Sequence, residues 1–160
     1  MLNKLNTIIE TTNFVDEYDY YKITEDLKVN ELGFVVRKCR KALFMDDCEI
    51  AMMCVVPEED SYVPMIVVDD YFRFLTPNTK QFTLLHELGH YNKQLDILVN
   101  GTDEYRNIEL EFEADEYAMS ILGKEKSIAA LKEIEHMINE MGYGSVCEEI
   151  ASRIENLESK

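Results

Sequence analysis

Two short apolar runs in the middle of the chain predict neighbouring β-strands. Residues 49–57 (EIAMMCVVP) and 62–70 (YVPMIVVDD) are rich in Val, Ile and Met, and an acidic, proline-containing turn separates them. Runs of this length bounded by turn residues are typical of strands, and the short separation favours a hairpin. We therefore expect a small β-sheet that contains this hairpin.

The second half of the chain carries helical patterns instead. Residues 76–99 open with helix start signals and then place Phe82, Leu85 and Leu88 at helical spacing, so a helix is expected there. Three more helical patterns follow, at 105–122, 124–141 and 145–157. Strands followed by a run of helices indicate the α+β class.

The length of the chain suits one compact domain. At 160 residues it can bury a core without disulfides or structural metals, and no internal repeat or low-complexity tract divides it. We expect a single domain over residues 1–160, in which the part from about 123 to 160 is a helical C-terminal extension.

The charge balance is strongly acidic. Thirty-two Asp and Glu residues against sixteen Lys and Arg give a net charge of −16. Such a charge repels phosphate backbones and anionic lipid head groups over roughly 8 to 10 Å. Direct nucleic-acid binding is therefore not expected. Either the charge attracts a basic protein partner, or it only keeps the surface solvated.

No feature of the sequence indicates a membrane protein or a secreted protein. No apolar run approaches the roughly 20 residues of a membrane span, and residues 1–14 lack the apolar core and cleavage site of a secretory signal. We expect a cytoplasmic protein. Cys39, Cys48, Cys54 and Cys147 form no CxxC pair and are expected to be reduced, mostly buried thiols.

A histidine pair inside the helix at 76–99 carries the strongest chemical signal. The segment HELGH places His86 and His90 four residues apart, so both rings lie on one helical face, with Glu87 one position round. Two imidazoles suit a zinc ion, and a carboxylate beside it can take a proton from water and pass it to a leaving amine. This HExxH pattern predicts a catalytic zinc site with Glu87 as the general base.

Gly89 lies inside the same motif, although glycine costs roughly 1 kcal/mol in a helix interior. Its position indicates that a neighbouring segment or the substrate passes close to that face. The HExxH pattern arises by chance in about one of a few hundred chains of this size. An amphipathic helix with two incidental histidines therefore remains the alternative.

Two histidines leave a catalytic zinc one short of its usual three protein ligands. His136, the only other histidine, lies in the helical segment 124–141 and could be a ligand. In such a segment, however, a surface or half-buried histidine that binds no metal is more common than a ligand. The acidic helical segment IELEFEADEYA, residues 108–118, offers carboxylates instead. We therefore expect the third ligand there.

The segments FTLLHELGH and EFEADEYA, in this order, resemble the motifs of the ImmA/IrrE family of metallopeptidases, a branch of the HExxH zincins. Relatives pair a helix like FTLAHELGH with a second helix of the form ExxA(D/N)x(F/Y)A, whose first glutamate completes the metal site. The match places this ligand at Glu111, with Ala114, Asp115 and Tyr117 at the other motif positions. It covers roughly residues 79–122.

Three glutamates crowd this stretch, Glu109, Glu111 and Glu113, and the family pattern selects among them. Glu111 lies four residues before Asp115 on one helical face, so the first can bind metal while the second accepts the free N–H of a ligand histidine. Glu113 faces elsewhere. Two alternatives remain: Glu113 is the ligand instead, or the site uses no carboxylate ligand.

The resemblance implies a zincin-like fold, in which a small β-sheet packs on the active-site helix, and a cytoplasmic zinc endopeptidase. Such enzymes cut a helix-turn-helix transcriptional repressor, often encoded beside them on a prophage or other mobile element, and a basic DNA-binding substrate would suit the acidic charge. An exposed strand in 49–54 or 65–70 could take the substrate by strand addition. Relatives often continue into an LL-M-P segment where this chain reads AMSILGKEKS, so its substrate cleft is expected to differ.

Several side chains could stabilise the oxyanion of a tetrahedral intermediate, and the pattern does not choose among Tyr91, Tyr117, Tyr143 and Arg106. The alternative is a non-catalytic binding module, in which a zincin fold binds its partner and acts as an anti-repressor or sensor. An intact Glu87 favours the enzyme, because a structural zinc site needs no general base.

Overall fold

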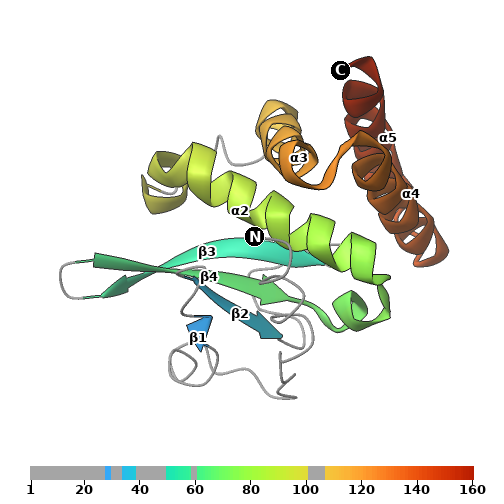
Figure 1. Cartoon of the computed structure of the whole chain (residues 1–160). Helices are drawn as coiled ribbons and strands as arrows, with labels where there is room; N and C mark the ends of the chain where they lie inside the picture. The colour runs from blue at the N-terminus through green and yellow to red at the C-terminus, as the bar shows by residue number, and fades with distance from the viewer. Residues whose placement is uncertain (1–27, 30–33, 39–49, 59–60, 101–106) are drawn as a thin grey trace. The chain divides into compact units, whose positions relative to one another are not determined.

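The computed structural model of the protein describes residues 28–29, 34–38, 50–58, 61–100 and 107–160. The chain divides into two compact units, residues 1–74 and 75–160. The described strands lie in the first unit and the described α-helices in the second, which confirms the α+β class (Figure 1). The single domain expected over residues 1–160 stays a prediction.

The described strands of the first unit form a four-stranded mixed sheet in the order β1-β2-β4-β3. They are β1 (Lys28–Val29), β2 (Phe34–Lys38), β3 (Ala51–Glu58) and β4 (Ser61–Val68). β3 and β4 form the expected antiparallel hairpin, whereas β2 lies parallel to β4 on its other side. The sequence analysis did not predict β1 and β2, which pair antiparallel with each other. The parallel pairing of β2 with β4 depends on a crossover connection that local patterns do not reveal.

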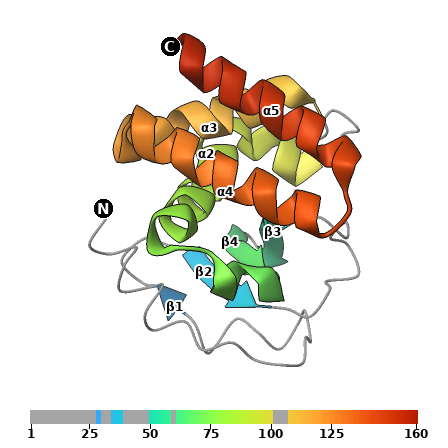
Figure 2. The same ribbon diagram turned by 90° about the vertical axis from the view of Figure 1, so that its right-hand side faces the viewer.

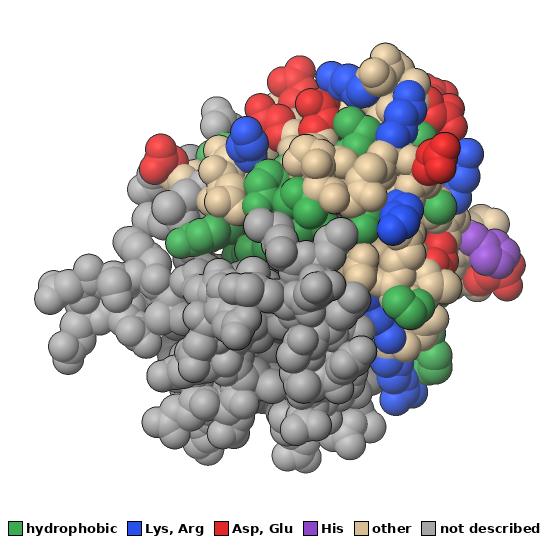
Figure 3. Space-filling view, in the orientation of Figure 1, with side chains coloured by type: hydrophobic (Ala, Val, Ile, Leu, Met, Phe, Trp, Pro, Cys, Tyr) green, Lys and Arg blue, Asp and Glu red, His purple; other side chains and the backbone are tan. Residues whose placement is uncertain are grey.

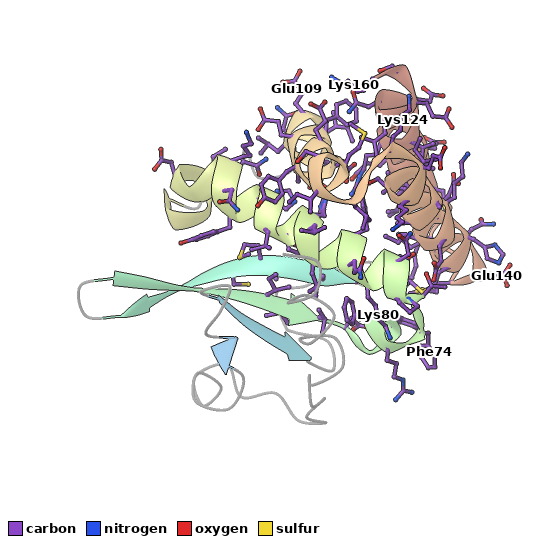
Figure 4. All side chains as sticks on the ribbon, in the orientation of Figure 1. Phe74, Lys80, Glu109, Lys124, Glu140 and Lys160 are labelled. Carbon is purple, nitrogen blue, oxygen red and sulfur yellow. The ribbon has the colours of Figure 1, made fainter. Side chains whose placement is uncertain are left out.

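A short 3-10 helix, η2 (Asp70–Phe74), follows β4. Its Phe72 is buried, whereas Tyr71 and Phe74 are exposed; Phe74 is labelled in Figure 4. The guanidinium carbon of Arg73 lies 4.5 Å from the centre of the Phe74 ring, which is the geometry of a cation–π contact.

The described α-helices of the second unit are α2 (Pro77–Asn100), α3 (Ile108–Leu122), α4 (Lys124–Glu140) and α5 (Gly144–Ser159). Each was predicted from the sequence, and each begins and ends within a few residues of its expected bounds. α3 contacts the other three helices, and α4 and α5 lie side by side (Figures 1 and 2). Side chains from α2 and α5 can therefore meet on α3.

Polar contacts define the ends of these helices. The side chain of Asn107 caps α3, and Gly123, with a φ of 94°, separates α3 from α4. At the start of α2, the Glu133 carboxylate of α4 accepts hydrogen bonds from the backbone N–H of Thr76 at 2.7 Å and from the hydroxyls of Thr76 and Thr79. The beginning of the motif helix is thereby anchored to α4.

The interior of the helical unit is apolar, and its buried residues include Leu85, Leu88, Ala118, Leu131, Ile154 and Leu157. On the face seen in Figure 3, acidic side chains of this unit lie among lysine and arginine side chains. Within the described part of the chain, no helix has the length and apolar character needed to cross a membrane.

Candidate metal centre

His86 and His90 lie one turn apart on α2, and both are buried, with 7% and 6% of their surface exposed. Their rings meet edge to face, with centroids 4.6 Å apart. The two Nε2 atoms are 3.1 Å apart. The spacing of the HELGH segment therefore brings both imidazoles to one point, as the sequence predicted.

α3 brings Glu111 to the same point. Its Oε2 lies 3.2 Å from Nε2 of His86, and its Oε1 lies 3.4 Å from Nε2 of His90. A tetrahedral zinc ion with bonds of about 2.0 to 2.1 Å holds its donor atoms roughly 3.3 Å apart. The three side chains thus form a group that could hold a metal ion, and two imidazoles with a carboxylate match the donors of catalytic zinc sites.

The two helices approach each other closely at Gly89, between the two histidines. A Cβ atom here would lie 2.7 Å from the Cα of Ala114 and 2.9 Å from its carbonyl oxygen, which is too close for any side chain. The close neighbour expected from the sequence is therefore the backbone of α3. Glu111 lies three residues before Ala114 and Asp115 follows it directly, so this contact determines how near their carboxylates come to α2.

Asp115 is fully buried and orients His86. Its Oδ1 lies 2.8 Å from Nδ1 of His86. An ionised carboxylate only accepts hydrogen bonds, so Nδ1 donates and Nε2 is left to face the metal group. The sequence predicted this kind of contact without choosing between the two histidines, and in the structure the partner of Asp115 is His86.

His90 has a different partner, Gln94, which the sequence did not single out. Nδ1 of His90 lies 2.7 Å from Oε1 of Gln94, and Nε2 of Gln94 donates to the carbonyl of Leu110 on α3 at 2.8 Å. Because the amide nitrogen is the donor to Leu110, the amide oxygen accepts the Nδ1 proton of His90. Gln94 departs from helical geometry, with φ −131° and ψ 25°. Its spacing of four residues from His90 was the available signal.

Arg153 of α5 reaches into the same cluster, and no sequence pattern indicated it. Its Nε and Nη2 donate to Oδ2 and Oδ1 of Asp115, both at 2.8 Å, and its Nη1 lies 3.1 Å from Oε2 of Glu111. Nη2 also lies 3.2 Å from Nδ1 of His86, because both nitrogens donate to the same oxygen of Asp115. Arg153 and Asp115 are 38 residues apart in the sequence, so only tertiary packing brings them into contact.

The charges of this cluster act strongly on one another. Burial and the charge of Arg153 lower the pKa of His86, but the hydrogen bond and charge of Asp115 and the hydrogen bond of Glu111 outweigh them and raise it to about 10. Burial raises the pKa of Glu111, whereas Arg153 and the two histidines hold it well below its usual value. Burial also raises the pKa of Asp115, and Arg153 and His86 again lower it below the usual value. Metal-free His86 is therefore protonated near neutral pH.

Glu87, the predicted general base, follows His86 directly on α2 and is buried, with 5% of its surface exposed. The alternative ligands Glu113 and His136 are exposed and do not belong to the metal group found among the described residues. Glu109 is exposed as well and lies on the outer side of α3 in Figure 4. The structure thus brings Glu111 to the histidines and leaves the other two glutamates outside.

Among the described residues, the tyrosines named as oxyanion candidates make no hydrogen bond to this cluster. Tyr91, Tyr117 and Tyr143 are half-buried, and the Tyr117 hydroxyl accepts a hydrogen bond of 3.4 Å from the side chain of Asn92. Arg106, Cys39 and Cys48 lie outside the described residues. Cys54 and Cys147 are half-buried, less buried than expected.

The described helices therefore gather six side chains in one cluster. His86, His90 and Glu111 are the candidate ligands, and Asp115, Gln94 and Arg153 surround them. A scan against protein-family models and searches of curated proteins and of solved structures find no match to this chain.

Proposed function

We propose that the protein is a zinc-dependent endopeptidase of the ImmA/IrrE type, in which His86, His90 and Glu111 hold the metal ion. The convergence of these side chains carries the proposal, because their donor atoms lie 3.1, 3.2 and 3.4 Å apart, close to the separation that a tetrahedral ion needs. The hydrogen bonds to Asp115 and Gln94 leave Nε2 of both histidines for the ion. Three protein ligands, rather than the four of a structural site, leave a position for reaction.

A zinc ion held here would polarise a substrate carbonyl and lower the pKa of a water molecule. Glu87 would accept the proton of the attacking water on its carboxylate and deliver it to the nitrogen of the leaving amine. Its burial directly after His86 supports this role. The two histidines bind and orient only, because their Nδ1 protons are already held by Asp115 and Gln94.

The fold and the substrate belong to the same proposal. We propose a zincin-like fold for the protein, with an exposed strand that receives an extended substrate. The substrate is a basic helix-turn-helix repressor of a prophage or other mobile element, which the net charge of −16 would attract in the cytoplasm.

Metal analysis tests the site. Protein that is stripped with a chelator and reloaded with zinc is expected to hold about one ion per chain, and the double variant His86→Ala/His90→Ala none. Glu113→Ala, at an exposed position of α3, is the matched control and should keep the ion. Stoichiometric zinc in the double variant would show that the ion is bound elsewhere.

Digestion of a purified helix-turn-helix repressor, encoded beside the gene of this protein, tests the activity. Zinc-loaded wild type is expected to cut it at a defined bond, identified by mass spectrometry. Glu87→Gln should keep zinc and fold but lose cleavage, because an amide has the same shape and accepts no proton. Cleavage by this variant at the wild-type rate would exclude Glu87 as the base. A repressor that binds the zinc-loaded wild type and stays intact would favour the binding module.

A further inference from the structure

We infer that Arg153 is a positioning residue of the metal site, which holds the carboxylates of Glu111 and Asp115 in their working orientation. This inference rests on the proposed metal site. Arg153 belongs to neither sequence motif and lies on α5, a helix to which the sequence assigned no role. The metal site is therefore built from α2, α3 and α5.

The guanidinium of Arg153 directs all three of its nitrogens at carboxylates of the site. Nε and Nη2 donate to the two oxygens of Asp115, each at 2.8 Å, a two-point contact that the planar fork of arginine makes and lysine does not. Nη1 lies 3.1 Å from Oε2 of Glu111, and the Arg153 side chain is only 12% exposed. Salt and water therefore screen these contacts little.

Two further ion pairs among the described residues, one made by α5 and one by Lys160 directly after it, are exposed rather than buried. Lys132 and Glu158 are 57% and 52% exposed, and Lys160 and Glu116 are 45% and 39% exposed. Exposed pairs of this kind hold helices together only weakly. Burying a guanidinium is costly unless several good contacts offset the loss of water. The burial of Arg153 against the candidate ligands thus indicates a role in the site.

Arg153 also contacts carboxylate oxygens that face His86. Oδ1 of Asp115 accepts from both His86 and Arg153, so the guanidinium fixes the group that orients His86. On Glu111, Oε2 lies 3.1 Å from Nη1 of Arg153 and 3.2 Å from Nε2 of His86, and Oε1 lies 3.4 Å from Nε2 of His90. Because the guanidinium engages Oε2 and limits rotation of the carboxylate, we expect Glu111 to bind the ion through one oxygen while Arg153 is present.

The positive charge of Arg153, taken by itself, weakens the binding of a metal ion, whereas its positioning contacts strengthen it. A guanidinium repels a divalent cation, so removal of the charge alone would strengthen zinc binding. Loss of the positioning contacts would weaken it, because both carboxylates would be free to turn away. The direction of the change in zinc affinity therefore separates the two effects.

Competitive zinc titrations of wild type, Arg153→Lys and Arg153→Met provide the test. Lysine keeps the charge without the two-point contact, and methionine removes both. We expect both variants to bind zinc roughly 10- to 100-fold more weakly. Lys132→Met, which breaks an exposed ion pair with Glu158 on α5, is the matched control and should keep wild-type affinity. Wild-type or tighter zinc binding in the Arg153 variants would overturn the inference. If Arg153→Met does not fold, Arg153→Lys decides alone.

Cobalt-loaded protein supplies a readout that a purely structural role would not change. The visible bands of cobalt weaken as its coordination rises beyond tetrahedral, so a second oxygen from Glu111 would be seen directly. We expect weaker, shifted bands for Arg153→Lys and an unchanged spectrum for Lys132→Met. If wild type binds zinc but the spectrum of Arg153→Lys equals that of wild type, this inference is wrong and the proposed function stands. A wild type that binds no zinc would overturn both.

Discussion

A Cβ atom on Gly89 would lie 2.7 Å from the Cα of Ala114, so the backbones of the two helices that carry the candidate ligands are in close contact here. The contact lies between His86 and His90 on one helix and beside Glu111 on the other. Because the helices are this close, the short glutamate side chain spans the gap to both imidazoles. The metal group depends on this approach of α2 and α3.

Gly89→Ala is expected to lower the free energy of unfolding of the metal-free protein by about 1 to 3 kcal/mol, the usual cost of overpacking. Alanine stabilises an open helix position by about 1 kcal/mol, but here its methyl group would meet backbone atoms that cannot rotate away. Urea unfolding measures the change, and Lys93→Ala, at an exposed position of α2, is the control expected to be neutral or stabilising. An equally stable Gly89→Ala would contradict the close approach.

Gln94→Met is expected to weaken zinc binding about tenfold or more, because methionine fills a similar volume but accepts no hydrogen bond from His90. The ring of His90 would then be free to turn, and the bond to Leu110 on α3 would be lost as well. Competition with a chromophoric chelator measures the affinity. Lys93→Met, one residue earlier and exposed, serves as the control. Equal dissociation constants for Gln94→Met and wild type would show that the amide does not orient His90.

Asp115→Ala is expected to reduce zinc affinity or activity roughly 10- to 100-fold with little change in helix content, because His86 loses the group that orients it. The metal-free protein should also lose about 3 to 5 kcal/mol of stability, since Arg153 would stay buried without its main partner. Zinc titration and urea unfolding measure the two effects, with Glu113→Ala as the exposed control on the same helix. Affinity equal to that of wild type would remove Asp115 from the site.

The stability of the metal-free protein is expected to fall as the pH rises from about 7 toward 10. The pKa of His86 is 6.5 in the unfolded chain and about 10 in the folded one. A group whose pKa is raised by folding contributes stability that is complete below the unfolded pKa and is lost as the pH rises through the folded pKa. Denaturant midpoints in the presence of chelator measure this decline. In His86→Ala it should be much smaller, and an equal decline in both proteins would assign it to another group.

Zinc binding near neutral pH is expected to release about one proton per ion, because the ion displaces the proton of His86. Calorimetric titrations in two buffers with different ionisation enthalpies count the proton. The same observed enthalpy in both buffers would mean that the metal-free His86 is already neutral at that pH.

Features that depend on local spacing could be predicted from the sequence. Residues four apart share one face of a helix in any surroundings, so His86 could be paired with His90, and Glu111 with Asp115, before any contact was known. The β3–β4 hairpin and the four helices were predictable for the same reason, because turn residues and apolar periodicity are local. Gly89 indicated a close neighbour, since a glycine inside a helix is costly without one.

Which faces of the helices and strands meet could not be predicted in this way. β2 joins the sheet parallel to β4, a pairing between distant segments that local patterns do not encode. Asp115 contacts His86, Gln94 contacts His90, and Arg153 enters from α5, 38 residues beyond Asp115. Such contacts follow from how whole helices cross, and the crossing is decided by the packing of all their side chains rather than by the spacing of a few. The candidate ligands were therefore predictable, whereas most of the residues that hold them in place were not.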